Sequence, residues 1–365
     1  MLTLLALSVS LGTAQPSEAA PFFETGVVKA SAPGESNQLP VIARTESGRL
    51  FAVWTHSLDG KQKPVIVGSF STDGGRAWGE PTTLIDTPGK DDYDANIVVD
   101  GKRLLVYSTT TGDQSKGIDR SWVWMTYTED DGKTWTKPVE IPLPFRYFVG
   151  KRHIGIKLRN GTLAMGFSWD LWAQAGTPAR AEGEMDLKSG VLLSRDHGLT
   201  WTPHGDLHIF EPKTLPGATG GLCEPALVEL ANGELYMLMR TGTSRIYEAR
   251  SRDGGLTWSK PRPSKLTGHN APMALWRLDR NPKEVIVIWN NSPRERTPLS
   301  VAITTDGGRS WSRPKNVAAS PLGVAYPGIT QAPDGAFVAV WHQRLAQGGF
   351  DIRWARFNRA WVLQP

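Results

Sequence analysis

Apolar residues recur along this chain in six short runs, each introduced by a turn and each ending in polar residues. The runs are nearly continuous in apolar side chains, as expected for strands that are buried on both faces. With their turns, they occupy Gly48–Trp54, Gly101–Tyr107, Gly161–Phe167, Gly233–Met239, Lys283–Trp289 and Gly335–Trp341. No long amphipathic helix stands out between them. The pattern therefore predicts six similar antiparallel sheets.

A second repeat, with the pattern Ser/Thr-x-Asp-x-Gly-x-x-Trp, alternates with the first. Its five copies occupy residues 71–78, 128–135, 194–201, 251–258 and 304–311. Their aspartates are 57, 66, 57 and 53 residues apart, a spacing typical of propeller or solenoid repeats. In such a turn the carboxylate accepts backbone hydrogen bonds, Gly supplies a positive φ, and Trp is buried between sheets. One carboxylate per turn is too few for the roughly six to eight oxygen ligands of Ca²⁺, so we interpret the motif as structural.

Together the two repeats predict an all-β fold, a six-bladed β-propeller of four-stranded antiparallel blades, with residues 21–365 as a single domain. The sixth blade has no Asp-containing turn. We expect Phe350–Trp354 and a strand from the beginning of the domain to complete it and to close the ring. Residues 1–20 are apolar and then small, as in a signal peptide, which predicts a secreted or periplasmic protein.

Composition narrows the range of partners. The net charge is +5, but the basic residues are scattered, so we expect no nucleic-acid binding. No later segment approaches the length of about 18 apolar residues that a membrane span needs. Cys223 is the only cysteine, which excludes an internal disulfide, and we interpret it as a buried apolar side chain. We expect a monomer without cofactor or metal, in which His56, His153 and His342 line a pocket or are structural.

The polar ends of the six apolar runs should meet on one rim of the ring, because the blades are equivalent. The starts of the preceding, inner strands fall on the same rim, since paired strands run antiparallel. These starts carry Gln38, Asp94, Asn96, Arg152, His153, Glu224, Asn270 and Tyr326. The sequence thus predicts a depression for a polar ligand at one end of the axis, with the Asp-containing turns at the opposite end.

These features resemble the sialidase (neuraminidase) family of exo-acting retaining glycoside hydrolases. The likeness covers the domain and is closest in residues 223–241, 296–299 and 325–327. The resemblance implies that Tyr326 is the nucleophile, Glu224 the base that activates it, and Asp59 the acid/base. It also implies that Arg240 and Arg296 bind the carboxylate of a terminal sialic acid on a glycan or glycoconjugate.

The side chains implied by the resemblance suit the chemistry of such a substrate. A carboxylate nucleophile would be repelled by the carboxylate of sialic acid, whereas a Tyr hydroxyl is neutral until a nearby Glu deprotonates it. Guanidinium groups bind a carboxylate bidentately. The structural alternative for Glu224 and Arg240 is a buried ion pair without a role in catalysis.

The chain departs from the family on its first inner strand. Sialidases carry an Arg-Ile-Pro motif there, and this chain has Gln38-Leu39-Pro40. Arg44 should be too far along the strand to replace the missing arginine, whereas Arg152 could reach inward from the third blade. Either two arginines and Gln38 hold the substrate carboxylate, or the ligand is not sialic acid.

Three hypotheses about function therefore remain. The first is a sialidase-type hydrolase that releases a terminal acidic sugar. The second is a propeller hydrolase or lyase that acts on another sugar, such as a uronic acid or rhamnose. The third is a non-catalytic glycan-binding propeller. Fold alone does not distinguish them.

Overall fold

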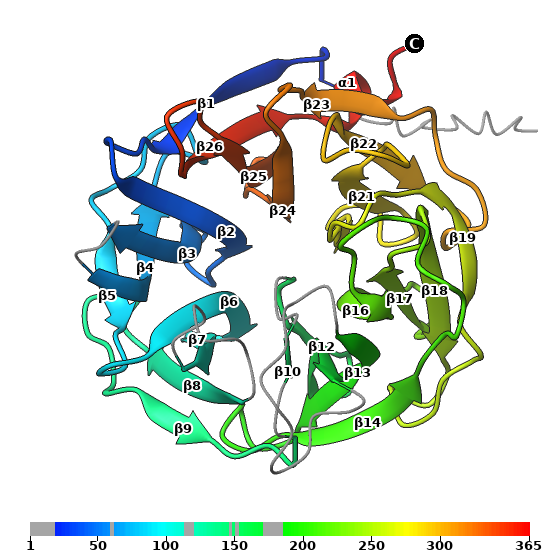
Figure 1. The fold of residues 1–365 in the computed structure, drawn as a ribbon. Helices are drawn as coiled ribbons and strands as arrows, with labels where there is room; N and C mark the ends of the chain where they lie inside the picture. Colours follow the sequence, from blue (N-terminus) through cyan, green and yellow to red (C-terminus); the bar gives the residue numbers. More distant parts are fainter. Residues whose placement is uncertain (1–18, 59–61, 113–119, 146–147, 150–152, 171–184) are drawn as a thin grey trace, which may run out of the picture.

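The computed structural model describes residues 19–58, 62–112, 120–145, 148–149, 153–170 and 185–365. Most of the expected signal peptide lies outside this range. The strands form six antiparallel sheets arranged as blades around a central axis (Figure 1). The predicted six-bladed all-β propeller is thus confirmed. Within the described part of the chain, no helix has the length and apolarity needed to cross a membrane.

Four of the blades are regular four-stranded sheets, in which the chain runs from the axis outward. The first contains β2 (Glu35–Arg44), β3 (Leu50–Leu58), β4 (Gln62–Ser71) and β5 (Thr82–Ile85). The second contains β6 (Asp91–Asp100), β7 (Arg103–Thr111), β8 (Ser121–Thr128) and β9 (Val139–Ile141). The fourth contains β16 (Cys223–Glu229), β17 (Leu235–Arg240), β18 (Arg245–Ser251) and β19 (Arg262–Thr267). The fifth contains β20 (Ala274–Arg277), β21 (Val285–Asn290), β22 (Leu299–Thr304) and β23 (Lys315–Ala318).

The third blade has the four-stranded path of the other blades and two further two-residue strands beside it, so that its sheet contains six strands. They are β10 (Phe148–Val149), β11 (Ile156–Lys157), β12 (Leu163–Asp170), β13 (Asp186–Ser194), β14 (Thr202–Leu207) and β15 (Gly220–Gly221). The two short strands β10 and β11 both pair with β12 at the inner edge. Just before β11, Gly155 bonds instead to the second blade, where its N–H donates to Ile97 O at 2.8 Å. This link to a neighbouring blade accounts for the interrupted inner edge.

The sixth blade joins the two ends of the domain. Its strands, from the axis outward, are β24 (Val324–Gln331), β25 (Phe337–Arg344), β26 (Phe350–Phe357) and β1 (Phe23–Lys29). The N-terminal β1 pairs antiparallel with β26, and Phe23 lies opposite Phe357. In Figure 1 the blue β1 runs along the red β26. The predicted closure of the ring is therefore confirmed.

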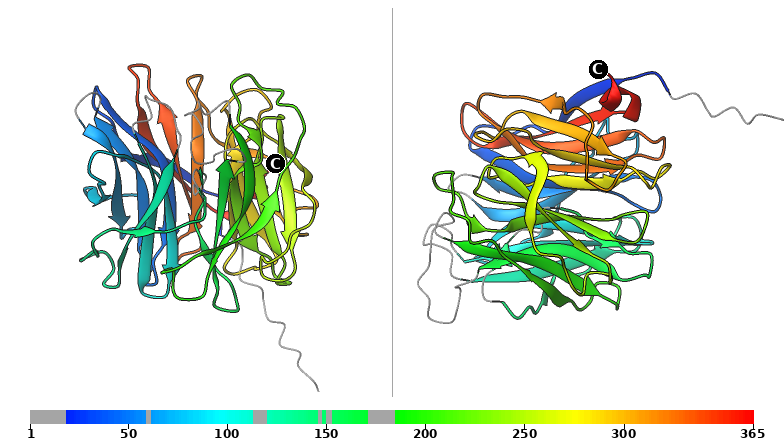
Figure 2. Two further views of the ribbon diagram at one scale, coloured as in Figure 1. Left: turned by 60° about the horizontal axis from the view of Figure 1, so that its bottom comes forward. Right: turned by 90° about the vertical axis from the view of Figure 1, so that its right-hand side faces the viewer.

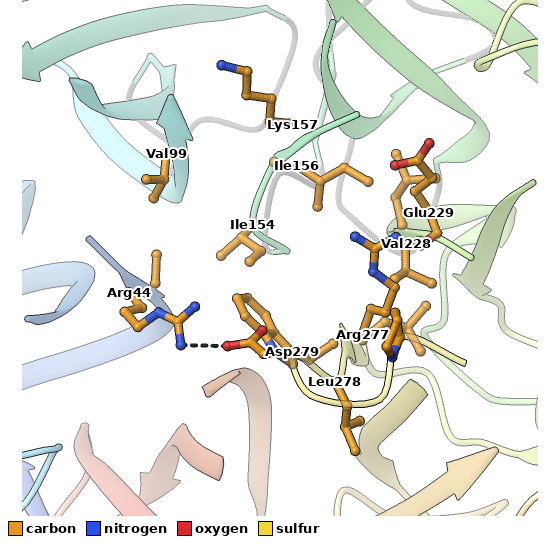
Figure 3. A pocket seen from close by; sticks show the side chains of 16 residues that line it. Arg44, Val99, Ile154, Ile156, Lys157, Val228, Glu229, Arg277, Leu278 and Asp279 are labelled. Carbon is orange, nitrogen blue, oxygen red and sulfur yellow. Dashed lines mark hydrogen bonds and ion pairs between the residues drawn. The ribbon is translucent and has the colours of Figure 1, made fainter. Parts of the chain in front are cut away.

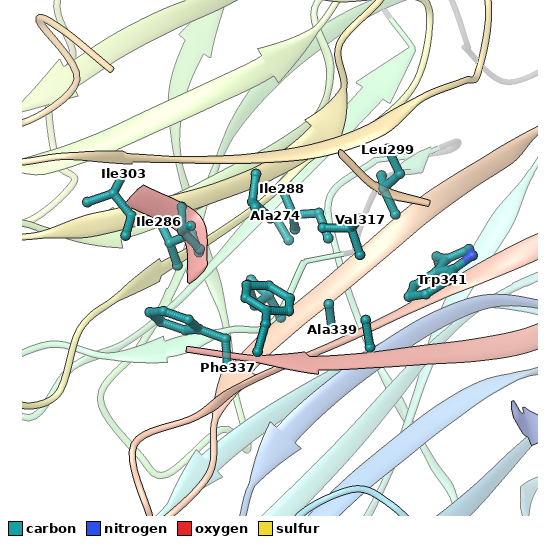
Figure 4. Close-up of a cluster of buried hydrophobic side chains, with 14 of the residues drawn as sticks. Ala274, Ile286, Ile288, Leu299, Ile303, Val317, Phe337, Ala339 and Trp341 are labelled. Atoms are coloured by element: carbon teal, nitrogen blue, oxygen red, sulfur yellow. The ribbon is translucent and has the colours of Figure 1, made fainter. Parts of the chain in front are cut away.

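A separate hydrophobic cluster fills the interface between each pair of neighbouring blades. Each Trp of the five Asp-containing turns packs in a different cluster: Trp78, Trp135, Trp201, Trp258 and Trp311. The sixth cluster, between the fifth and sixth blades, contains Ile286, Ile288 and Phe337 (Figure 4). Trp361 packs against it from the short helix α1 (Arg359–Leu363), so α1 takes the place of the missing sixth turn.

The Asp-containing turns have the predicted hydrogen bonds. In the first, the Asp73 carboxylate accepts from the backbone N–H groups of Arg76 and Ala77, both at 3.0 Å. In the fourth, hydrogen bonds from the Thr257 side chain and backbone lower the pKa of Asp253 to about 2. Each turn follows the third strand of its blade and therefore lies at the end of the ring opposite the starts of the inner strands. Figure 2 shows the strands running between these two ends.

Candidate active site

The inner strands carry β-bulges at the end of the ring where they begin. Four of them contain a non-glycine residue with positive φ at the bulge: Leu39 (59°), Asp94 (52°), Glu224 (48°) and Tyr326 (55°). Such a backbone conformation costs about 1–3 kcal/mol and is concentrated at functional sites. A bulge also redirects a side chain relative to the regular alternation of a strand. Equivalent distortions in four blades therefore set up the wall of one site.

Glu224 and Tyr326 meet at a single arginine. Nη1 of Arg240, at the end of β17, lies 2.7 Å from Glu224 Oε2 and donates to Tyr326 Oη at 3.5 Å. All three residues are buried, with exposed fractions of 2% for Glu224 and Arg240 and 6% for Tyr326. The backbone N–H of Glu224 donates to Ser168 Oγ at 3.0 Å, which fixes the bulge against the third blade. The predicted convergence of these three residues is present.

Asn270 holds a second arginine beside the first. Its side-chain Oδ1 accepts from Arg240 Nε at 2.7 Å, and its backbone carbonyl accepts from Arg296 Nη2 at 2.8 Å. The guanidinium carbon of Arg296 lies 5.1 Å from the centre of the Tyr326 ring. Burial, followed by the charges of Arg296 and Arg240, lowers the pKa of the neighbouring His269. The two guanidinium groups thus make this part of the site electropositive.

A small apolar cluster that includes Tyr326 borders the site. Leu39 packs with Ala325 and Tyr326, and the partly buried Tyr93 lies against them. His342 orients Tyr326 edge-on, with 4.9 Å between the ring centres, and its Nδ1 accepts the N–H of Leu39 at 3.4 Å. His342 is therefore structural or lines the site, in agreement with the interpretation from the sequence.

The structure also places Gln38 and Arg44. Gln38 is half-buried on β2, next to Leu39 and opposite Thr55. Arg44 ends the same strand at the other end of the ring, where it pairs with Asp279 at 2.6 Å, so it cannot replace the missing arginine. Asp59 and Arg152 lie outside the described residues. The catalytic and binding roles of all these residues stay predictions.

Two residues that the sequence placed on this rim were given no role there. Asp94 occupies the bulge equivalent to that of Glu224, and Asn270 positions both arginines. A proline follows three of the four strained residues, at positions 40, 225 and 327. Proline within a sheet is confined mainly to edges and bulges, so this recurrence could have revealed the bulges. The hydrogen bonds between Asn270 and the two arginines leave no comparable pattern in the sequence.

His153 ties three blades together at the axis. Its Nε2 lies 2.9 Å from Leu275 O in the fifth blade, and its Nδ1 lies 3.5 Å from Leu227 N in the fourth. Burial lowers its pKa to about 4, so the ring is neutral at pH 7. His153 is thus structural. In the described part of the chain, no cluster of three or more His, Cys, Asp or Glu residues could hold a metal ion.

Comparisons with known proteins agree with this architecture. The model of the BNR repeat-like domain family matches residues 48–339. The chain is 24% identical over 359 residues to a sialidase of Micromonospora viridifaciens (89% of the chain, 52% of that protein). It is 27% identical over 320 residues to a sialidase of Bacteroides fragilis (75% of the chain, 54% of that protein). It therefore spans about half the length of either relative.

A solved structure shows the same fold. The NanB sialidase from Streptococcus pneumoniae superposes with a TM-score of 0.73 at 14% sequence identity, covering 91% of this chain and 70% of that one.

Proposed function

The chain belongs to the family of BNR repeat-like domains, and on that premise we propose that it is a sialidase-type glycoside hydrolase. Its proposed substrate is a glycan or glycoconjugate that ends in an acidic sugar, sialic acid in the first instance. The similarity to two sialidases over most of the chain supports this class of enzyme.

The observation that carries the proposal is the contact of one buried arginine with both a carboxylate and a phenol. Arg240 lies 2.7 Å from Glu224 and 3.5 Å from Tyr326, with a second guanidinium group beside the phenol ring. A structural ion pair between Glu224 and Arg240 needs neither Tyr326 nor Arg296. The addition of Tyr326, which is buried and has a strained backbone, and of the half-buried Arg296 beside it favours a catalytic site.

In the proposed reaction, Arg240 and Arg296 hold the sugar carboxylate, and their charges stabilise the negative charge that develops on Tyr326 Oη. This oxygen attacks the anomeric carbon while Glu224 accepts its proton. Asp59 donates a proton to the departing glycosidic oxygen. Water then attacks the anomeric carbon and gives its proton to Asp59, while the bond to Tyr326 Oη breaks and Glu224 returns the proton to that oxygen. The two displacements retain the anomeric configuration.

Gln38 favours a second candidate. It replaces a charged group by an amide at the start of β2, and a lost charged hydrogen bond weakens binding by about 1.5–3 kcal/mol. A sugar that carries its carboxylate elsewhere, such as a uronic acid, would not need that third positive charge. This alternative keeps Glu224 and Tyr326 in the reaction but changes the substrate.

The test is turnover of a fluorogenic sialoside by the wild type and by Tyr326→Phe and Glu224→Gln. We expect each substitution to lower kcat by at least about a hundredfold, because each removes a group that acts in the transition state. Tyr127→Phe, which removes a phenol oxygen from β8 in another blade, is the matched control and should leave turnover unchanged.

The outcomes separate the hypotheses. Cleavage of a uronic-acid or rhamnose glycoside, with no turnover of the sialoside, would support the second candidate. Glycan binding without turnover of any glycoside would exclude an enzyme and support a binding propeller. Full activity of Tyr326→Phe would remove the tyrosine from the mechanism.

A further inference from the structure

A cavity of about 430 Å³ lies at the other end of the ring, where the inner strands finish. Its walls come from five blades and include Arg44, Val99, Lys157, Glu229 and Arg277 (Figure 3). None of its lining residues belongs to the candidate active site. Its volume lies in the range of about 300–1,000 Å³ that small-molecule sites occupy.

Apolar side chains form about half of the cavity wall. Ile154 and Ile156 form one side, and Val228 and Leu278 lie across from them (Figure 3). Trp276 also lines the cavity. These side chains suit a ligand with an apolar body.

Two of the three cations around the cavity are neutralised by carboxylates. Arg44 lies 2.6 Å from Asp279, and Lys157 Nζ lies 2.6 Å from Asp100. These pairs leave little positive charge for a ligand, since each cation already has a close counter-ion.

Arg277 differs from the other two cations. Its Nη1 donates to the main-chain carbonyl of Glu229 at 3.0 Å, and no carboxylate lies within 4.0 Å of it among the described residues. Burial, with the nearby charge of Arg159, lowers the pKa of Arg277. The nearby carboxylates of Glu229 and Asp279 offset part of the charge of Arg277 without pairing with it directly; Glu229 Oε2 accepts the backbone N–H of Arg159 at 3.1 Å, and Asp279 pairs with Arg44. A half-buried guanidinium group with a neutral partner is a binding point for an anion.

We propose that this cavity is a second ligand site, separate from the candidate active site, which binds a small organic carboxylate with an apolar body. The carboxylate pairs with Arg277, and the apolar body lies against Ile154, Ile156 and Trp276. A divalent or strongly hydrated anion fits less well, because Glu229 and Asp279 also face the cavity and apolar side chains form about half of its wall.

The test measures binding of indole-3-acetate and of its neutral analogue indole-3-acetamide to the full chain by isothermal titration calorimetry. We expect the acid to bind at least about tenfold more tightly than the amide, since a charged hydrogen bond is replaced by a neutral one. Arg277→Gln should abolish this preference, whereas Arg277→Lys should retain part of it. Arg280→Gln, an exposed arginine on the same segment, is the matched control and should bind like the wild type.

Several results would overturn the proposal. These are equal binding of acid and amide, an unchanged preference in an Arg277→Gln variant with wild-type thermal stability, or no binding at millimolar concentration. Plain acetate binding as tightly as indole-3-acetate would refute the apolar contribution. Tyr326→Phe must bind the probe like the wild type, because a loss there would place the probe in the candidate active site. These measurements do not depend on glycosidase activity.

Discussion

The pair of Glu224 and Arg240 offers the sharpest test of whether this site is functional or merely structural. Both side chains are almost completely buried, with exposed fractions of 1% and 2%, and their charged atoms are 2.7 Å apart. Arg240→Met keeps the apolar stem of the side chain but leaves the Glu224 carboxylate without its arginine. Breaking a buried ion pair in this way costs about 3–5 kcal/mol.

The expected loss translates into a measurable melting shift. With about 345 residues in the domain and an unfolding entropy of about 2.1 cal/mol/K per residue, the unfolding entropy of the whole domain is about 0.7 kcal/mol/K. Arg240→Met should therefore lower Tm by about 4–7 °C at pH 7, measured by differential scanning calorimetry. The exposed pair of Arg76 and Glu24, 2.8 Å apart, provides the control: Arg76→Met should lower Tm by no more than about 1 °C.

The double variant Glu224→Gln/Arg240→Met separates stability from function. It removes both charges, so most of the lost stability should return, to within about 2 kcal/mol of the wild type. Turnover of the sialoside should stay absent, because the variant lacks the proposed base and a carboxylate-binding group. Wild-type activity in the double variant would show that the pair is only structural. An unchanged Tm in Arg240→Met would refute the energetic reasoning itself.

Two further predictions concern the propeller. Burial lowers the pKa of His153 from 6.5 to about 4, so as the pH falls His153 is protonated in the unfolded state before it is protonated in the folded state. The free energy of unfolding should therefore drop by up to about 3 kcal/mol between pH 7 and 4. His153→Gln should reduce this pH dependence, measured by urea unfolding at several pH values. A Cβ added to Gly198 (φ 85°) would lie 2.5 Å from Tyr107 Oη, whereas a Cβ added to Gly161 (φ 87°) would have no other atom within 4 Å. Gly198→Ala should therefore unfold at least about 1 kcal/mol more easily than Gly161→Ala, and equal losses would refute the steric argument.

Local sequence determined the number and type of the elements. Turn chemistry and strand periodicity depend on neighbouring residues, so the Asp-containing turns, the six apolar runs and the closing β1 could all be predicted. The meeting of Glu224, Arg240 and Tyr326 could also be predicted, because equivalent blades place equivalent strand positions at one end of the axis. Arg296 was expected there only from the resemblance to sialidases. The replacement of the sixth turn by Trp361 on α1 could not, since that segment lacks the repeat.

Only the tertiary structure decided how the side chains meet. Arg240 and Tyr326 are 86 positions apart and belong to different blades, and the bulges at the inner strands determine their separation. The same holds for Asn270, which joins two arginines, and for Arg277, whose cavity is built from five blades. Contacts across the axis depend on closure of the whole ring and on the position of each strand along the axis. A local pattern of residues encodes neither of them.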